Sequence, residues 1–311
     1  MRARGPTSRH LEREFVRLYS GGVRWRWVFS SSNLLPSIAI NGVMRAAKDV
    51  YCRLLNLIFP EDCHVCGERL REVSRVPVCH RCLAEPAPMQ AEFFCTSCRT
   101  PFLNRAPLDE SGQCALCRLG LIGFDAAYAY GSHEGALRKL VHLLKYEKIR
   151  SLGRILARFV VGVLPKDRAF DAIVPMPLHW WRRARRGFNQ SDALAREIGR
   201  VTGLPVLRTV RRVKATTPQA GLTNARRRQN MSGAFRVKRG RRGEIAGLRL
   251  LLVDDVLTTG ATAAACARVL KRAGAAHVTV AVVARADRRI GLSYTPEVST
   301  TLLTAAAGSA T

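Results

Sequence analysis

The stretch LLVDDVLTTGAT, residues 251–262, decides the fold expected of this chain. Its apolar first half is typical of a buried strand, and Asp254 and Asp255 stand at the end of that strand. A short loop of threonine and glycine then leads into a helix expected from Thr262 to Ala273, which Gly274 ends. A strand that passes through a loop into a helix is the repeating unit of α/β proteins with parallel sheets.

Alternating strands and helices extend this pattern from residue 124 onward. Strands are expected at 124–131, 172–176, 250–253 and 277–283, and helices at about 137–144, 152–163, 189–203 and 262–273. The first strand alternates and is expected at an edge, and Leu194, Ile198 and Val201 lie on one face of the helix expected at 189–203. Buried strands joined by helices imply a parallel sheet covered on both faces.

The loop after the acid pair has the chemistry of a phosphate site. At a helix start, backbone N–H groups without partners and the positive end of the helix dipole attract phosphate. The residues expected to bind ligand are Thr258, Thr259, Gly260, Ala261 and Thr262. Asp254 and Asp255 can accept hydrogen bonds from vicinal ribose hydroxyls or help to hold a hydrated Mg²⁺. A capped helix after a solvated acid pair would explain each residue alone, but the contiguous string favours a ligand site.

Cysteines dominate the chain before residue 118. Eight of the ten form CxxC pairs: Cys63 with Cys66, Cys79 with Cys82, Cys95 with Cys98, and Cys114 with Cys117. Two such turns can present four thiolates to one tetrahedral Zn²⁺. The intervals between neighbouring pairs are residues 67–78 and 99–113, and only the second has the usual length.

Structural zinc is favoured over disulfides for these cysteines. The N-terminus does not resemble a secretory signal, because Glu12 and Glu14 fall where its apolar core would be. A closed four-thiolate shell leaves no open position, so one or two structural Zn²⁺ ions are expected. The spacing leaves consecutive and interleaved pairing both open. Cys52 and Cys266 are expected to be small buried side chains.

The formal net charge of +28 indicates anionic partners such as a nucleotide, a phosphosugar or a nucleic acid. Arginine supplies much of the excess, and a coding bias would explain part of it. No stretch approaches the roughly 18 apolar residues of a membrane-spanning helix. We therefore expect no membrane span and a soluble cytoplasmic protein.

The two ends of the chain are expected to lie outside the folded part. The predicted organisation is a disordered extension over 1–50, a double zinc ribbon over 51–120, an α/β domain over 121–290 and a disordered tail over 291–311. Met44 precedes a short amphipathic run, so translation starting there is an alternative to Met1.

Several motifs occur in an order that resembles a known family. LLVDDVLTTGAT resembles the phosphoribosyl pyrophosphate motif of type I phosphoribosyltransferases. The cysteine module resembles the ComF (GntX-like) family of competence-related proteins, as do LKYEKIRSLG (144–153), AIVPMPLHWWRRARRGFNQSDALA (172–195) and TPQAGLTNARRRQNMSGAF (217–235). The resemblance covers about residues 52–286. One departure is that Cys98 and Cys117 lack a following glycine such as Gly67.

The resemblance implies a type I phosphoribosyltransferase-like sheet flanked by helices, preceded by a small four-cysteine zinc-ribbon module. It implies that Mg²⁺ binds together with phosphoribosyl pyrophosphate, with Asp254 and Asp255 as the catalytic pair. It also places Arg185 and Arg186 in a pyrophosphate-binding loop after the strand 172–176. The region 211–228 corresponds to a mobile loop over the substrate. Trp180 and Trp181 either stack on a base or pack against the sheet.

Two functions follow from these expectations. The first is a phosphoribosyltransferase of unknown acceptor that is linked to DNA uptake in natural transformation. The alternative is a non-catalytic competence factor that binds single-stranded DNA and works with the DNA-uptake machinery, which the charge of +28 permits. Whether the chain is an enzyme stays open at this point.

Overall fold

The computed structural model describes residues 61–70, 75–102, 105–120, 122–167, 169–214 and 233–286. All of them belong to one compact unit, Cys52–Thr311. The predictions for residues 1–50, for a start at Met44, for Cys52 and for the tail lie outside the described residues. Most of the region 211–228 lies outside them as well.

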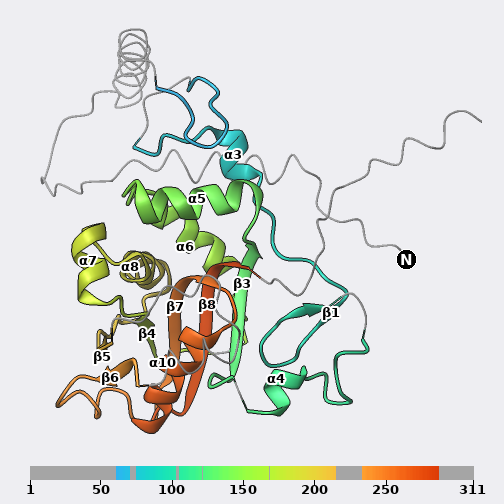
Figure 1. Cartoon of the computed structure of the whole chain (residues 1–311), viewed down its shortest axis with the longest axis vertical. Helices are drawn as coiled ribbons and strands as arrows, with labels where there is room; N and C mark the ends of the chain where they lie inside the picture. The colour runs from blue at the N-terminus through green and yellow to red at the C-terminus, as the bar shows by residue number, and fades with distance from the viewer. Residues whose placement is uncertain are drawn as a thin grey trace, which may run out of the picture. The chain divides into compact units, whose positions relative to one another are not determined.

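A four-stranded parallel sheet forms the centre of the unit, in the order β3-β8-β7-β4 (Figure 1). The strands are β3 (Ala126–Ser132), β4 (Ala172–Pro175), β7 (Arg249–Leu257) and β8 (His277–Arg285). The predicted edge position of the first strand is confirmed, because β3 pairs with β8 alone among these strands. The strand that carries the acid pair is longer than expected and continues to Leu257.

Both faces of the sheet are covered, as continuous apolar strands require. Along β7, Leu250 and Leu252 pack in one core cluster with residues of α10 (Ala261–Arg272). Leu251 and Val253 pack in the opposite cluster with residues of three helices. These are α5 (Gly135–Tyr146), α6 (Leu152–Gly162) and α8 (Gln190–Thr202). The predicted α/β class with a parallel sheet is confirmed.

Local sequence signals placed the helix ends within one or two residues. Gly203 ends α8 in the left-handed conformation at φ 76°, which glycine adopts without steric cost. On the face shared by Leu194, Ile198 and Val201, the first two residues are fully buried, whereas Val201, in the last turn of α8, is 52% exposed.

Short elements complete the described chain. The cysteine region contains α3 (His80–Ala84), β1 (Phe93–Phe94), β2 (Pro101–Phe102) and α4 (Ala115–Arg118), with β1 and β2 antiparallel. The helix α7 (Trp180–Arg186) follows β4. A second antiparallel pair, β5 (Val210–Arg212) and β6 (Phe235–Val237), precedes β7.

Candidate functional site

The acid pair lies in the carboxyl-terminal part of β7. Parallel pairing places Asp254 beside Val282 of β8, while β4 ends at Pro175 opposite Val253. Ligands of open α/β sheets bind beyond the carboxyl ends of the strands. Both carboxylates therefore lie at the carboxyl end of the sheet, where such sites form.

Asp254 is held by two donors on one oxygen. The hydroxyl of Ser191, in the first turn of α8, donates to Oδ1 at 2.9 Å, and the backbone N–H of Asp255 donates to the same atom at 2.9 Å. Burial, together with the charge of Asp255, raises the pKa of Asp254 to about 7. A carboxylate that is costly to charge gains from a ligand that donates hydrogen bonds or carries positive charge.

Asp255 has a cationic partner that the sequence reasoning missed. Nζ of Lys145, in the last turn of α5, lies 3.1 Å from Oδ1 of Asp255, and both side chains are largely buried. Burial lowers the pKa of the neighbouring His133, helped by the charges of Lys145 and Arg138 and opposed by Asp255. Lys145 stands in LKYEKIRSLG, one of the family motifs, and this was the available signal.

The Thr/Gly loop has the geometry of a helix start. Gly260 takes φ 74° as the residue before α10, which begins at Ala261 rather than at the expected Thr262. Oγ1 of Thr259 is buried and has no hydrogen-bond partner among the described residues. A buried hydroxyl without a partner is costly unless a ligand satisfies it. The loop therefore fits a phosphate group, which accepts hydrogen bonds from hydroxyls and backbone N–H groups.

The arginines predicted in a loop lie on the helix α7 instead. The guanidinium of Arg185 stacks 5.7 Å from the ring of Trp181. That of Arg186 stacks 5.0 Å from the ring of Tyr146 and donates to its hydroxyl at 3.4 Å. This segment forms a helix because His179 caps its start: Nδ1 of His179 accepts a hydrogen bond from the N–H of Trp181.

Two other arginines interact with each other, and one of them, Arg212, also interacts with the acid pair. Burial lowers the pKa of Arg212, at the end of β5, and the charge of Arg182 adds to this effect while that of Asp254 opposes it. Burial likewise lowers the pKa of Arg182, which lies on α7 with Arg185 and Arg186. Arg212 thus places positive charge near Asp254, and the charge of Arg182 acts on Arg212. The resemblance had placed Arg182 with the arginines of the pyrophosphate-binding loop and Arg212 at the start of the region 211–228, but it predicted no interaction of either with Asp254.

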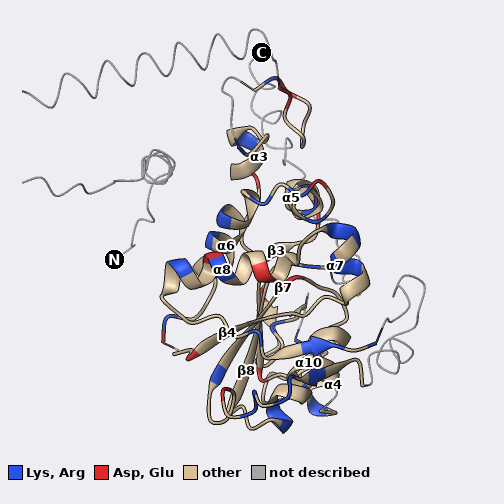
Figure 2. Ribbon diagram, turned by 90° about the vertical axis from the view of Figure 1, so that its left-hand side faces the viewer, with Lys and Arg blue, Asp and Glu red and all other residues tan. Residues whose placement is uncertain are grey.

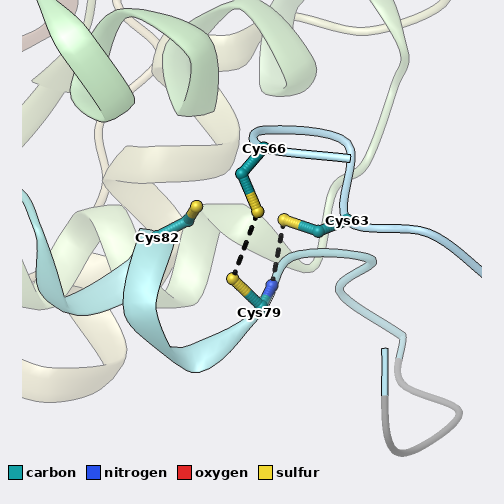
Figure 3. Close-up of side chains that lie close together, drawn as sticks. All are labelled: Cys63, Cys66, Cys79 and Cys82. Carbon is teal, nitrogen blue, oxygen red and sulfur yellow. Dashed lines mark hydrogen bonds between the residues drawn. The ribbon is translucent and has the colours of Figure 1, made fainter. Parts of the chain in front are cut away.

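The eight paired cysteines form two clusters, each made of consecutive pairs. The first cluster contains Cys63, Cys66, Cys79 and Cys82 (Figure 3), and the second contains Cys95, Cys98, Cys114 and Cys117. Within each cluster the four sulfurs lie within 4.8 Å of one another, and all eight thiols are free rather than joined in disulfides. The structure thereby decides between the consecutive and interleaved alternatives.

Sulfur separations in both clusters match a tetrahedral zinc shell. Zn–S bonds of roughly 2.3 Å imply sulfurs about 3.8 Å apart. Cys66 and Cys79 Sγ are 3.7 Å apart in the first cluster, and Cys98 and Cys114 Sγ are 3.7 Å apart in the second. The donor set and its geometry therefore fit one zinc ion in each cluster.

The two clusters repeat the same backbone turn. The N–H of Gly67 donates to the carbonyl of Cys63 at 2.8 Å, and the N–H of Arg99 donates to the carbonyl of Cys95 at 3.0 Å. Gly67 has φ 77° and Arg99 has φ 54°, so both occupy the left-handed region. Arg99 therefore takes the conformation for which a glycine was expected, and the missing glycine does not prevent the turn.

A buried arginine connects the second cluster to the sheet. Arg285, the last residue of β8, donates to the carbonyl of Cys98 at 2.8 Å and to Oγ1 of Thr100 at 2.5 Å. The Thr100 hydroxyl in turn lies 2.8 Å from Sγ of Cys98. Arg285 also pairs with Leu257 of β7, directly before the Thr/Gly loop. One residue thus touches both the second cysteine cluster and the strand end that carries the candidate ligand site.

Comparisons with known proteins identify a phosphoribosyltransferase domain and several sequence relatives. The sequence profile of the family described as "Phosphoribosyl transferase domain" matches residues 184–307. Competence protein F of Haemophilus influenzae is 33% identical over 181 residues, which are 56% of this chain and 79% of that protein. DNA utilization protein YhgH of Salmonella typhimurium is 32% identical over 231 residues, which are 72% of this chain and 96% of that protein.

Two solved structures show weaker likeness. Glutamine phosphoribosylpyrophosphate amidotransferase from B. subtilis, complexed with ADP and GMP, has a TM-score of 0.28 and 22% identity, over 42% of this chain and 25% of that one. A structure of the allosteric regulatory enzyme of purine biosynthesis has a TM-score of 0.30 and 20% identity, over 43% of this chain and 26% of that one. Neither likeness is close enough to carry an argument about activity.

Fold, clusters and sequence comparisons together define a phosphoribosyltransferase-type α/β domain with an N-terminal module of two four-cysteine clusters. The chain belongs to the ComF (GntX-like) family, whose members here include Competence protein F and DNA utilization protein YhgH. Among the described residues, no helix has both the length and the apolar character to cross a membrane.

Proposed function

We propose that the chain binds phosphoribosyl pyrophosphate with Mg²⁺ at the carboxyl end of β7. One observation carries this proposal: Asp254 and Asp255 lie near the end of β7, just before a Thr/Gly loop at the start of α10 in which the Thr259 hydroxyl has no partner among the described residues. Carboxylates suit ribose hydroxyls, and the loop suits phosphate. The net charge of +28 favours such an anionic ligand.

Each part of the site has a proposed role. Asp254 and Asp255 accept hydrogen bonds from the ribose hydroxyls, and residues 258–262 bind the phosphate through hydroxyls and backbone N–H groups. Arg185 and Arg186 contact the pyrophosphate. We add Arg182 and Arg212 to this set because they interact electrostatically with each other and Arg212 also with Asp254. When bound, Mg²⁺ neutralises pyrophosphate charge.

A phosphoribosyl transfer is the reaction that this arrangement supports best, and the acceptor is left open. In that reaction the bond between the ribose carbon and pyrophosphate breaks while a bond to the acceptor nucleophile forms, and both bonding electrons leave with pyrophosphate. The chain would contribute mainly positioning and electrostatic stabilisation, through the acid pair and the arginines. We place this activity in the cytoplasm, in a domain spanning about residues 121–290.

The proposed biological setting is DNA uptake in natural transformation, with the cysteine module of about residues 51–120 holding two structural Zn²⁺ ions. Support comes from the names of two relatives, Competence protein F and DNA utilization protein YhgH. A second candidate function is a non-catalytic factor that binds single-stranded DNA. It is favoured by the exposed Trp180 and Trp181 beside the arginines of α7.

Isothermal titration with phosphoribosyl pyrophosphate and Mg²⁺ tests the ligand. We expect binding by the wild type and at least about tenfold weaker binding by Asp254→Asn and Asp255→Asn, because each removes a charge-assisted hydrogen-bond acceptor. Asp171→Asn is the matched control, since Asp171 pairs with Arg249 at the amino-terminal ends of β4 and β7, away from the acid pair. A wild type that does not bind would reject the proposal.

A screen for pyrophosphate release over candidate acceptors tests the transfer itself. Release that depends on an acceptor, and that is lost in the Asp254→Asn and Asp255→Asn variants, supports the enzyme. Tight binding without release for any acceptor would favour the non-catalytic candidate instead.

A further inference from the structure

The exposed aromatic side chains of the described chain are concentrated in one place. Trp180 is 71% exposed, Trp181 is 54% exposed and Tyr146 is 50% exposed, whereas the other large exposed hydrophobic residues described are the aliphatic Leu119 and Val201. Both tryptophans belong to α7, and Tyr146 ends α5. Packing of the tryptophans against the sheet, one of the two sequence-based alternatives, is therefore wrong. An exposed indole is a costly surface unless something binds it.

Arginines are interleaved with these rings. The helix reads WWRRARR and contains no acidic residue, and Figure 2 shows its bands of basic residues. Arg185 stacks on Trp181 and Arg186 on Tyr146, at 5.7 Å and 5.0 Å from the ring centres. Trp181 and Arg185 are four residues apart, so they lie on one face of the helix. Stacking holds each guanidinium beside a flat ring in a fixed orientation.

We propose that α7, together with Tyr146, is a stacking surface for single-stranded DNA. We call it the α7 surface and define it by Trp180, Trp181, Arg183, Arg185, Arg186 and Tyr146. Bases would stack on the exposed rings while the arginines contact the phosphates between them. A single strand presents the faces of its bases, whereas a duplex hides them inside its stack. This inference deepens the DNA-linked part of the proposed function and does not depend on phosphoribosyl pyrophosphate.

Charge and shape favour this occupant over two others. An acidic protein segment would satisfy the arginines but would make no use of two adjacent exposed indoles. A membrane surface would need a longer apolar face than α7 offers, because interfacial helices bury a continuous stripe of large apolar side chains. Ala184 is the remaining uncharged residue of α7, so the helix has no such stripe.

Arg185 and Arg186 belong both to the α7 surface and to the arginines that the proposed function assigns to pyrophosphate. A bound strand and bound pyrophosphate would therefore compete for these two side chains.

Fluorescence anisotropy with a labelled oligothymidylate tests the surface in the full chain. Trp180→Ala with Trp181→Ala should weaken binding by at least about tenfold with little change in salt dependence, since stacking releases no counterions. Arg183→Gln with Arg185→Gln should also weaken binding and should reduce the slope of log affinity against log salt by about 1.4, at roughly 0.7 per phosphate contact. Arg242→Gln with Arg272→Gln is the charge-matched control. Both residues are exposed and lie in the segments that lead into the amino-terminal ends of β7 and β8, away from α7.

The outcomes separate the surface from the wider function. Wild-type protein that fails to bind the oligonucleotide would reject the DNA-linked function together with the surface. Wild-type binding that the tryptophan variant retains within twofold would reject the surface alone. Polyglutamate serves as the acidic-protein probe, and an equal loss of polyglutamate binding in the tryptophan variant would overturn base stacking in favour of an acidic partner. Unchanged circular dichroism of the variants shows that they fold, as expected for exposed positions.

Discussion

The two cysteine clusters have the same ligands and the same turns but different surroundings. In the first cluster Cys66 is exposed and Cys79 is partly exposed, whereas in the second three of the four cysteines are buried. The buried residues of the first belong to the core on the α5, α6 and α8 face, and those of the second to the core on the α10 face. A repeated cysteine pattern therefore does not mean that both clusters contribute equally to the fold.

The contacts that attach each cluster to the sheet and its helices explain the difference. Around the first cluster, Lys139 of α5 donates to the carbonyl of Val65 at 2.8 Å, and His64 bonds Glu147 at 2.7 Å. These contacts involve exposed side chains that water can replace. The second cluster is attached by the buried Arg285 from β8. We therefore expect the second cluster to unfold only together with the sheet, and the first to open separately.

Removing one ligand from each cluster should give the largest contrast. Cys98→Ser should destroy the second metal site and lower the free energy of unfolding by about 4 kcal/mol or more, because an unliganded, polar pocket would remain in the core. Cys66→Ser should release one zinc equivalent with a much smaller loss of stability. Zinc analysis and thermal unfolding of both variants measure the two effects.

Cys266→Ser provides the control for this pair, since Cys266 is buried in α10 and takes no part in either cluster. It should retain both zinc equivalents. Equal destabilisation by Cys98→Ser and Cys66→Ser would contradict the view that the clusters differ in their coupling to the core.

The residues that attach the clusters should differ in the same direction. Arg285→Met removes two buried hydrogen bonds, one of them to the threonine beside the Cys98 sulfur, and should cost about 2–3 kcal/mol. Lys139→Met removes one part-buried hydrogen bond from an exposed side chain and should cost about 1 kcal/mol. Chemical unfolding measures both, and Arg285→Lys should recover only part of the loss. If Lys139→Met proved the more costly change, the assignment of Arg285 as the main attachment would fail.

The two clusters should lose zinc to a chelator at different rates. With an excess of a colorimetric chelator, one zinc equivalent should leave at least about ten times faster than the other, a difference of about 1.4 kcal/mol in barrier. The fast phase belongs to the first cluster, because the sulfur of Cys66 is open to the chelator. Cys66→Ser should abolish this phase and leave the slow one unchanged. Release of both equivalents in a single phase would remove the kinetic difference.

Local pattern was enough to predict the fold and to identify which residues of each candidate site lie together. The apolar run 250–253 identified the central strand, and Gly203 marked the end of α8. Each CxxC pair lies within one turn, so its two sulfurs converge whatever the rest of the chain does. Asp254, Asp255 and residues 258–262 form one contiguous segment, and for this reason the sequence could place them together.

What the sequence could not supply came from long-range contacts. Lys145 meets Asp255, and Arg285 meets Cys98, across separations that no short motif spans. The two tryptophans of α7 have the same apolar character whether buried or exposed, so their exposure depended on where α7 lies. No local pattern marks Lys145 or Arg285 as buried. In the structure, Lys145 connects α5 to β7, and Arg285 connects β8 to the second cluster.

The smallest contrast concerns the residue that follows the first CxxC pair of each cluster. An added Cβ at Gly67 would meet no atom within 4 Å, so Gly67→Ala should cost only the left-handed backbone, about 1 kcal/mol. Arg99 already bears that strain and offsets part of it by stacking 4.8 Å from the ring of Phe94. Arg99→Ala should therefore be destabilising, and Arg99→Gly should be more stable than Arg99→Ala by thermal unfolding. If alanine at residue 99 were as stable as glycine, the left-handed turn would not be what the two clusters share.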